Sequence, residues 1–326
     1  MTGLIARRTF IAIAGAAAAT PAIAQAQPAP RPARVGVLVI AEADGRAIGQ
    51  VLREGLREAG YIEGQNIRFD IRSADGKVNL LPELAAELVR LKVDVIVAVF
   101  TPCALAAKQS TNQIPIVATS VGDPIGTGLV ASLSRPGGNV TGLTNLAAET
   151  AGKSVEMFRD IIPSLRRVGV LANPVDPFTK PFVEQVQLAG RTTGIEIKPL
   201  AMARGPEDFE PAFSSLTMEK ADAVVVQGIF FSKALADLAI KHRLPTASVL
   251  RSFVNVGGLM TYGANVPDLF RRSVVFVHKI LQGTSPADLP VEQPTKFELV
   301  INLRTAKAIG LAIPESFLLR ADTVIE

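Results

Sequence analysis

Few residues in this sequence could carry out chemistry, and they do not combine into a catalytic motif. The chain of 326 residues has two histidines, His242 and His278, and one cysteine, Cys103. The His-Glu-x-x-His zinc motif and the Gly-x-Ser-x-Gly nucleophile elbow do not occur. Patterns around the three residues favour a helix end for His242, an amphipathic helix for His278 and a small core position for Cys103. The sequence therefore predicts no metal site, no cofactor and no catalytic residue.

Two glycine-containing segments resemble nucleotide-binding motifs without completing them. The segment Gly152-Lys-Ser154 has the ending of a phosphate-binding loop, but alanine stands at position 147, where the motif needs glycine. The segment Gly126-x-Gly128-x-x-Ala131 resembles a dinucleotide fingerprint, but an Asp-Pro pair precedes it and it lies outside the first strand–helix unit. A nucleotide-dependent enzyme on an α/β scaffold therefore stays open only as an alternative.

Polar residues that directly follow predicted strands are the candidates for binding a small molecule. Thr101 and Pro102 follow the predicted strand 93–100. Threonine is a good N-cap and proline suits the first helical turn, so the helix N-terminus predicted here would present N–H groups to a carboxylate. Ser120 and Asp123 follow the next strand. Asp123 could hold an ammonium group through a charge-assisted hydrogen bond, or it could simply form a turn.

Equivalent positions recur later in the chain. Asn173 follows the predicted strand 168–172, and Gln227 follows the predicted strand 222–226. Tyr262, one of two tyrosines, could form an aromatic wall for an organic ligand or pack in the core. The complete predicted ligand-binding set is Thr101, Pro102, Ser120, Asp123, Asn145, Asn173, Gln227 and Tyr262.

These residues are positioned by an alternation of predicted strands and helices. The predicted strands at the start of the chain cover 35–40, 67–71, 93–100 and 115–119, and the helices between them cover 48–59, 80–91 and 102–111. Strands separated by helices of this length predict parallel sheets. In such sheets ligands bind outside the carboxyl ends of the strands, where the polar candidates stand.

The same pattern occurs twice. The run Arg34-Val-Gly-Val-Leu returns as Arg167-Val-Gly-Val-Leu, Asp94-Val-Ile-Val resembles Asp222-Ala-Val-Val, and both matches fall at a spacing of about 130 residues. We therefore predict an α/β fold of two similar doubly wound parallel-sheet lobes joined by a hinge. Closure of the two lobes would bury a small molecule in the cleft. The predicted lobe boundaries are 34–144 with 266–290 for the first lobe, and 145–263 with 293–326 for the second.

The N-terminus has the pattern of an export signal. Arg7-Arg8 precedes Thr-Phe-Ile, an alanine-rich apolar run and a small-residue cleavage site that ends at Ala26. The arginine pair favours the twin-arginine route, and an ordinary secretory signal is the alternative. We predict a signal peptide over 1–26, a proline-rich linker over 27–33 and a periplasmic protein. The net charge of +4 includes both arginines, so it does not favour nucleic acid, and no later segment is apolar enough for membrane insertion.

Several segments resemble a known family. Gly60-Tyr-Ile-Glu-Gly-Gln-Asn66, the run Gly122–Leu133, Arg135-Pro-Gly-Gly-Asn-Val-Thr-Gly142 and the run Pro286–Phe297 are together similar to the ABC-transporter substrate-binding family, whose named members include tryptophan- and tyrosine-type binding proteins. Two segments depart from its usual pattern: Phe100-Thr-Pro-Cys103 replaces Gly-Thr-Pro-Ala, and Tyr262-Gly-Ala-Asn265 replaces Tyr-Gly-Pro-Asn.

The resemblance implies a specific biological context. It implies a type I periplasmic-binding fold with three crossing segments, and a partner permease with its ATPase. The implied ligand is an amino acid, especially an aromatic one, or a related small carboxylate. We expect a monomer. A periplasmic sensing module that passes its ligand state to a receptor is the alternative to a transport protein.

Overall fold

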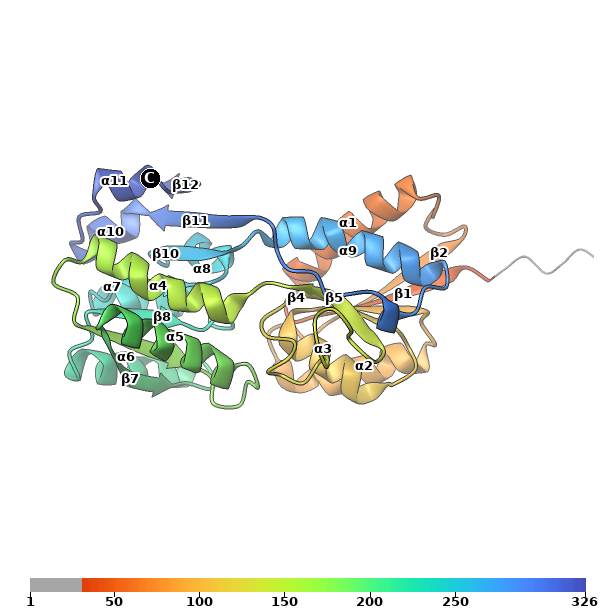
Figure 1. Ribbon diagram of the computed structural model, residues 1–326, viewed down its shortest axis with the longest axis horizontal. Helices are drawn as coiled ribbons and strands as arrows, with labels where there is room; N and C mark the ends of the chain where they lie inside the picture. Colours follow the sequence, from red (N-terminus) through yellow and green to blue (C-terminus); the bar gives the residue numbers. More distant parts are fainter. Residues whose placement is uncertain (1–30) are drawn as a thin grey trace, which may run out of the picture. The chain divides into compact units, whose positions relative to one another are not determined.

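The structure is a computed structural model that describes residues 31–326, so the predicted signal peptide lies outside the described residues. The described chain forms two β-sheets, each with helices on both of its faces (Figure 1). The predicted α/β fold with two lobes is confirmed. None of the helices within 31–326 is long and apolar enough to cross a membrane.

The first sheet has five parallel strands in the order β2-β1-β3-β4-β5. Its central strands are almost continuous runs of valine, isoleucine and alanine, as parallel strands covered on both faces require. The polar groups of the site therefore gather at the ends of the strands and just beyond them. The strands are β1 (Ala33–Val39), β2 (Ile67–Ser73), β3 (Val95–Val99), β4 (Ile116–Val121) and β5 (Val140–Thr144).

Helices cover both faces of the first sheet. Alternate residues of β1 point to opposite faces. Val37 packs with α1 (Glu42–Glu58) and α9 (Val266–Leu281), and Leu38 packs with α2 (Leu81–Arg90) and α3 (Phe100–Ser110). Figure 1 shows α1 and α9 on one side of this sheet and α2 and α3 on the other. The first lobe thus takes one of its helices, α9, from a distant part of the chain.

The second sheet has seven strands in the order β12-β11-β10-β9-β8-β6-β7. Strand β11 is antiparallel to β10, so this sheet is mixed, a feature that the predicted parallel-sheet lobes did not include. The chain returns from the first lobe before β11 and enters the second sheet from the opposite end. The strands are β6 (Arg167–Ala172), β7 (Glu196–Met202), β8 (Ala223–Val226), β9 (Thr246–Ser248), β10 (Met260–Ala264), β11 (Phe297–Asn302) and β12 (Thr323–Ile325).

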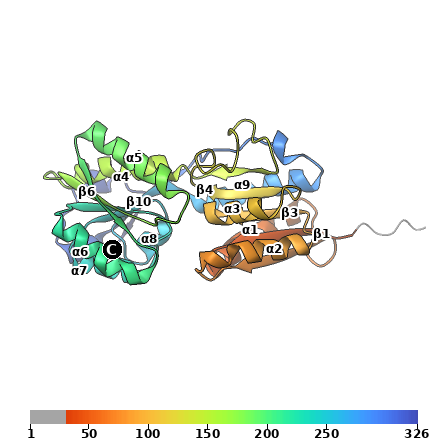
Figure 2. The same cartoon turned by 90° about the horizontal axis from the view of Figure 1, so that it is seen from below.

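The second sheet is also covered on both faces. Figure 2 shows α4 and α5 on one face and α6 and α7 on the other. The core repeats the arrangement of the first lobe, since Val170 of β6 packs towards α4 and α5 while Leu171 packs towards α6 and α7. The helices are α4 (Ala147–Ile161), α5 (Thr179–Thr193), α6 (Phe209–Met218), α7 (Lys233–Lys241), α8 (Arg251–Asn255), α10 (Leu303–Ile309) and α11 (Glu315–Leu318), and the short 3-10 turns are η1 (Val78–Leu80), η2 (Pro206–Asp208) and η3 (Pro286–Asp288).

The chain passes between the two sheets at three places: from β5 to α4, from β10 to α9, and from η3 to β11. The first and third connections lie side by side, because Thr144 N donates a hydrogen bond of 2.9 Å to the carbonyl of Glu292. Three crossings give the two lobes a shared hinge rather than a single linker. Strand ends of both sheets lie beside these crossings.

Candidate functional site

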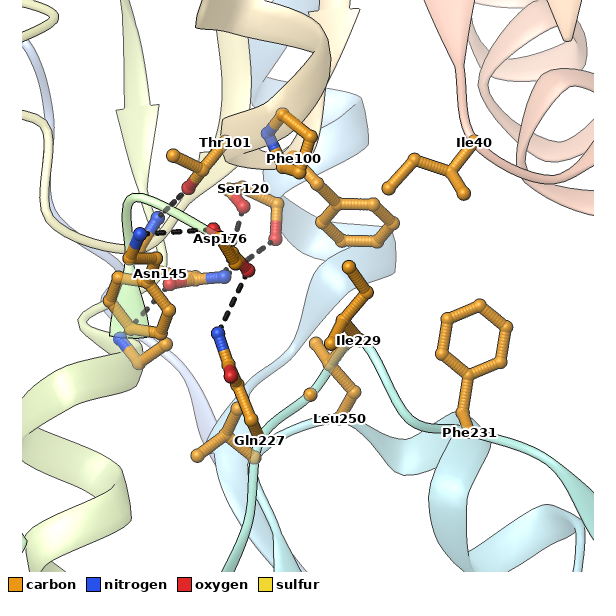
Figure 3. Close-up of a pocket in the computed structure, with 16 residues that line it drawn as sticks. Ile40, Phe100, Thr101, Ser120, Asn145, Asp176, Gln227, Ile229, Phe231 and Leu250 are labelled. Carbon is orange, nitrogen blue, oxygen red and sulfur yellow. Dashed lines mark hydrogen bonds between the residues drawn. The ribbon is translucent and has the colours of Figure 1, made fainter. Parts of the chain in front are cut away.

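A pocket lies where strand ends of the first lobe face loops of the second. It collects residues that are far apart in the sequence, and Figure 3 shows their side chains. The first lobe contributes residues at or just after the ends of β1, β3, β4 and β5, and the second contributes residues that follow β6, β8 and β9. The lining residues are Ile40, Phe100, Thr101, Pro102, Ser120, Gly122, Asn145, Ala147, Asp176, Phe178, Gln227, Gly228, Ile229, Phe231, Val249 and Leu250.

Five of the eight residues that the sequence nominated line this pocket. They come from the predicted strand ends of both lobes and from the first crossing between the lobes. The general rule that ligands meet the carboxyl ends of parallel strands therefore leads to this place in the molecule. The five residues are Thr101, Pro102, Ser120, Asn145 and Gln227.

Asp123 and Tyr262 are not among the residues that line the pocket. The Asp123 carboxylate accepts hydrogen bonds from the N–H groups of Ile125 (3.2 Å) and Gly126 (2.8 Å), which is the turn alternative. The Tyr262 ring, on β10, stacks on Phe297 of β11 with ring centroids 6.0 Å apart, which is the core alternative. Both side chains already have structural partners where they stand.

Asn173 lies beside the pocket and organises the loop that enters it. Its side-chain oxygen accepts a hydrogen bond of 3.0 Å from Val175 N, and its own N–H donates to Gln227 Oε1 at 2.7 Å. Asn173 lines an adjoining groove instead of the pocket. Asn173 does directly follow a strand of the second lobe, β6, as predicted.

Thr101 has a different role from the predicted N-cap. Helix α3 begins at Phe100, and the cap position is Val99, which provides no side-chain hydrogen bond. Thr101 lies in the first helical turn, where its Oγ1 accepts a hydrogen bond of 2.9 Å from Gly122 N. The hydroxyl hydrogen of Thr101 remains a donor. The first N–H groups of α3 have no acceptor within the helix, so this end still suits an anionic group.

Three of the seven non-glycine residues that have a positive φ in the described chain lie at the pocket. Phe100 and Ser120, which line it, have φ values of 68° and 59°, and Leu146, between two lining residues, has a φ of 52°. Non-glycine residues rarely adopt this left-handed conformation, and each such residue costs roughly 1–3 kcal/mol. Strain of this kind persists where the surrounding structure requires it and is typical of binding sites. The three values are therefore consistent with a binding site at this pocket.

Asn145 and Ser120 form a buried polar pair at the first crossing. The Asn145 amide donates to the Ser120 carbonyl at 2.9 Å and to Ser120 Oγ at 3.2 Å, and Asn145 Oδ1 accepts from Ala147 N at 3.0 Å. Asn145 thus connects the end of β4 to the start of α4. The Ser120 hydroxyl retains its hydrogen for a further acceptor.

Asp176 and Gln227 form the charged end of the pocket. Gln227 Nε2 donates to Asp176 Oδ2 at 2.8 Å, and Phe178 N donates to Asp176 Oδ1 at 2.9 Å. Burial raises the pKa of the Asp176 carboxyl above its ordinary value, and the hydrogen bond from Phe178 N offsets part of that rise. The carboxylate has neutral donors around it and no cationic partner among the residues that line the pocket.

Apolar side chains form the rest of the pocket wall. In Figure 3 the labelled polar side chains of Thr101, Ser120, Asn145 and Asp176 gather on one side. The labelled apolar side chains lie across the space from them: Ile40, Phe100, Ile229, Phe231 and Leu250. A ligand that fits this wall has one polar end and one large apolar end.

Sequence reasoning missed Asp176 and most of the apolar wall. Asp176 stands in the loop 173–178 that follows β6, so its place after a strand was the signal that could have found it. The two phenylalanines Phe100 and Phe231 carry no such signal, because apolar residues near strand ends resemble core residues in sequence. Their position against the pocket depends on how the loops fold.

The nucleotide-like segments do not meet at this pocket. Gly152 lies within α4 instead of preceding a helix, and the segment from Gly126 to Ala131 forms turns. Within residues 31–326 no group of three or more histidine, cysteine, aspartate or glutamate side chains is arranged to hold a metal ion.

Comparisons with known proteins agree on one family. The sequence model described as "ABC transporter substrate binding protein" matches residues 34–325. The chain is 29% identical over 262 residues to a tyrosine-binding protein of Clostridioides difficile (strain R20291), covering 79% of this chain and 75% of that protein.

Two solved structures are similar over most of the chain. A conserved domain protein of Vibrio cholerae shares 31% identity at a TM-score of 0.83, covering 90% of this chain and all of that one. The ABC domain of Streptococcus pneumoniae in complex with L-Trp shares 26% identity at a TM-score of 0.81, with the same coverage of both chains.

Proposed function

Because this chain belongs to the ABC transporter substrate-binding protein family, we propose that it is the periplasmic receptor of an ABC importer and that it captures an amino acid with a large apolar side chain. The ligand lies in the pocket lined by both lobes. The lobes close on it about the three crossings, and the closed form docks on a permease that works with an ATPase.

The division of the pocket into a polar end and an apolar wall carries this proposal. An α-amino acid has two charged groups on one carbon and a side chain that projects away from them. The N-terminus of α3 with the hydroxyls of Thr101 and Ser120 suits a carboxylate. Phe100 and Phe231 on the opposite wall suit an apolar or aromatic side chain, because aromatic rings bury a large area and stack favourably.

The relatives support an aromatic side chain. One similar protein is named for tyrosine, and one similar structure contains L-Trp. The apolar side chains of Phe100, Ile229, Phe231 and Leu250 line the pocket and offer contacts to such a ring. We therefore place tryptophan, tyrosine and phenylalanine first among candidate ligands.

Export and partners complete the proposal. The arginine pair and apolar run within 1–26 support export with cleavage after Ala26, and the family supports a permease with its ATPase. The mature protein acts as a monomer and has no catalytic role.

The proposal is tested by binding to the purified mature protein, residues 27–326. The protein is unfolded and refolded to remove any copurified ligand, and thermal unfolding is then measured with each amino acid and with small aromatic carboxylates. A ligand at about 100 times its Kd raises the free energy of unfolding by about 2.7 kcal/mol, which is readily detected. Isothermal titration then gives the Kd of each compound that stabilises the protein.

The expected result is stabilisation by one or more aromatic amino acids with a Kd in the micromolar range or below. A folded, ligand-free protein that no amino acid stabilises would contradict the proposal. Export is tested separately by fractionating cells that express the full chain, with Arg7→Lys and Arg8→Lys together as the variant that blocks a twin-arginine route.

A further inference from the structure

One ionisable side chain lines the pocket, and its charge restricts the ligands that the pocket can bind. Asp176 is the only ionisable residue among the 16 that line it in the described chain. The groove that adjoins the pocket past Pro102 and Ile229 again has Asp176 as its only ionisable lining residue. A ligand with only a negative charge would therefore meet an anion and no cationic side chain.

The Asp176 carboxylate is held in a defined orientation. It receives one hydrogen bond on each oxygen, from Gln227 Nε2 at 2.8 Å and from Phe178 N at 2.9 Å. A carboxylate oxygen can accept more than one hydrogen bond, so each oxygen keeps capacity for a ligand donor. Figure 3 shows the carboxylate at the polar end of the pocket, with the Gln227 amide directed at it.

Gln227 is a positioning residue for this carboxylate. Its Oε1 accepts hydrogen bonds from Asn173 N at 2.7 Å and from Thr179 Oγ1 at 3.0 Å. The backbone N–H of Asn173 can only donate, so the amide oxygen faces it and the amide NH₂ faces Asp176. The Gln227 side chain is buried and its polar atoms are engaged within the protein, which leaves Asp176 to meet the ligand.

The charge of Asp176 is incompletely compensated within the protein. Its two donors are neutral, and burial raises the pKa of its carboxyl because the charged form is partly desolvated. A protonated amine placed against Asp176 would supply the missing positive charge and form charge-assisted hydrogen bonds. The part of the pocket proposed for the ligand carboxylate differs from the surroundings of Asp176. There Thr101 and Ser120 offer neutral hydrogen-bond donors and no cation.

We infer that Asp176 is the specificity-determining residue of this site, which selects ligands that carry a protonated amine and rejects the matching carboxylates that lack one. The inference rests on the proposed function and narrows it. Amino acids remain as ligands, and simple aromatic carboxylates are excluded. The ammonium pairs with Asp176 while the ligand carboxylate meets the donors of α3.

The test compares pairs of ligands that differ only in the amine. Phenylalanine is paired with 3-phenylpropanoate, and tryptophan with 3-indolepropanoate, by isothermal titration against the wild type, Asp176→Asn and Asp237→Asn. Asp237 is the matched control, because it is an exposed aspartate of the same lobe whose carboxylate pairs with Lys233 on α7. Thermal unfolding and circular dichroism establish that each variant is folded.

We expect the wild type and Asp237→Asn to bind each amino acid about 30-fold or more tightly than its deaminated partner, as loss of one member of a buried charge pair predicts. Asp176→Asn should lose most of its affinity for the amino acid and bind the two partners within a few-fold of each other. Asp176→Glu keeps the charge and should keep the preference for the amine with lower affinity.

Wild-type protein that binds a deaminated acid as tightly as its amino acid would overturn the inference and leave the proposed function intact. The same conclusion follows if Asp176→Asn keeps the full preference for the amine. Wild-type protein that binds neither member of any pair would overturn both. The wild-type comparison needs no variant, so the inference remains testable if Asp176→Asn does not fold.

Discussion

The ring of Phe178 lies directly against the backbone of Gly122. A Cβ atom added at Gly122 would lie 2.5 Å from Cε2 of that ring, well inside van der Waals contact. Gly122 follows β4 of the first lobe, and Phe178 precedes α5 of the second, so this contact joins the lobes at the edge of the pocket. Glycine is needed here because the ring occupies the space of a side chain.

Gly122→Ala should therefore weaken ligand binding. The added methyl group displaces the Phe178 ring from the position that lines the pocket. Overpacking of this kind costs about 1–3 kcal/mol, and isothermal titration should show a loss of affinity of that size. Gly138→Ala is the control, because no atom lies within 4 Å of its added Cβ and its φ is not in the left-handed region. Unchanged affinity in Gly122→Ala would show that the contact does not persist in the ligand-bound form.

Ser120 should lower the stability of the fold through its backbone conformation and raise the ligand affinity through its hydroxyl. Its φ of 59° is strained for serine and relaxed for glycine, while its hydroxyl is a donor at the polar end of the pocket. Ser120→Gly and Ser120→Ala both remove the hydroxyl and should both lower ligand affinity. Ser120→Ala keeps the strain, so chemical denaturation should find Ser120→Gly more stable than Ser120→Ala by about 1 kcal/mol. Equal stability of the two variants would argue against strain at this position.

Gln227→Leu should destabilise the fold and weaken binding together. Leucine approximates the shape of glutamine but leaves the buried N–H of Asn173 without its acceptor and Asp176 without one donor. An unsatisfied buried donor costs about 1–3 kcal/mol, measurable as a lower free energy of unfolding. If binding survives while stability falls, Gln227 supports the loop without orienting Asp176.

Gln227→Glu is the variant matched to Gln227→Leu. It keeps the shape of the side chain and adds a negative charge, so it tests the effect of charge alone. It keeps the oxygen that faces Asn173 and places a second carboxylate against Asp176. Like charges at this distance raise one pKa, so the variant should be more destabilised, relative to wild type, at pH 8 than at pH 5.

Ligand affinity should depend on pH through Asp176. Burial raises the pKa of its carboxyl, and an ammonium ligand pairs with the ionised form. Affinity is therefore full above that pKa and falls as the pH decreases through it. Isothermal titration between pH 4 and pH 8 should show this fall in the wild type and not in Asp176→Asn.

The contribution of Asp176 to the stability of the ligand-free protein should change with pH in the opposite direction to its effect on ligand affinity. A carboxyl whose pKa is raised by folding is more favourable to the fold in its protonated form, so its contribution to stability decreases as the pH rises through the folded pKa. Denaturation of wild type and Asp176→Asn across the same range isolates this contribution. If the stability of Asp176→Asn depends on pH in the same way as that of the wild type, the dependence comes from other groups.

Local patterns in the sequence determined the two-lobed α/β fold. Apolar runs of five to eight residues separated by amphipathic segments predict strands covered by helices, and the repeat of Arg34-Val-Gly-Val-Leu at Arg167 indicates a second lobe. The sequence pattern located the helix starts less well. Helix α1 begins at Glu42, before the amphipathic pattern starts at Ile48, because its first turn is polar and carries no periodic signal.

The strand-end rule located part of the site. It led to Thr101, Ser120 and Gln227, because a parallel sheet places every strand end at one edge. It could not distinguish a side chain aimed into the pocket from one used by its own turn. Asp123 satisfies two N–H groups of its turn, and Asp176, at a similar place after β6, faces the pocket.

The sequence by itself determined the alternation of strands and helices, the duplication and the edge of each sheet at which a ligand would bind, because these depend on periodicity and on short-range chain geometry. Only the tertiary structure decided which loop residues of the two lobes meet. It placed Asp176 against Gln227, the Phe178 ring on Gly122, and Tyr262 away from the pocket against Phe297. Those contacts join residues tens of positions apart, and they depend on how the chain crosses between the lobes, which no local pattern records.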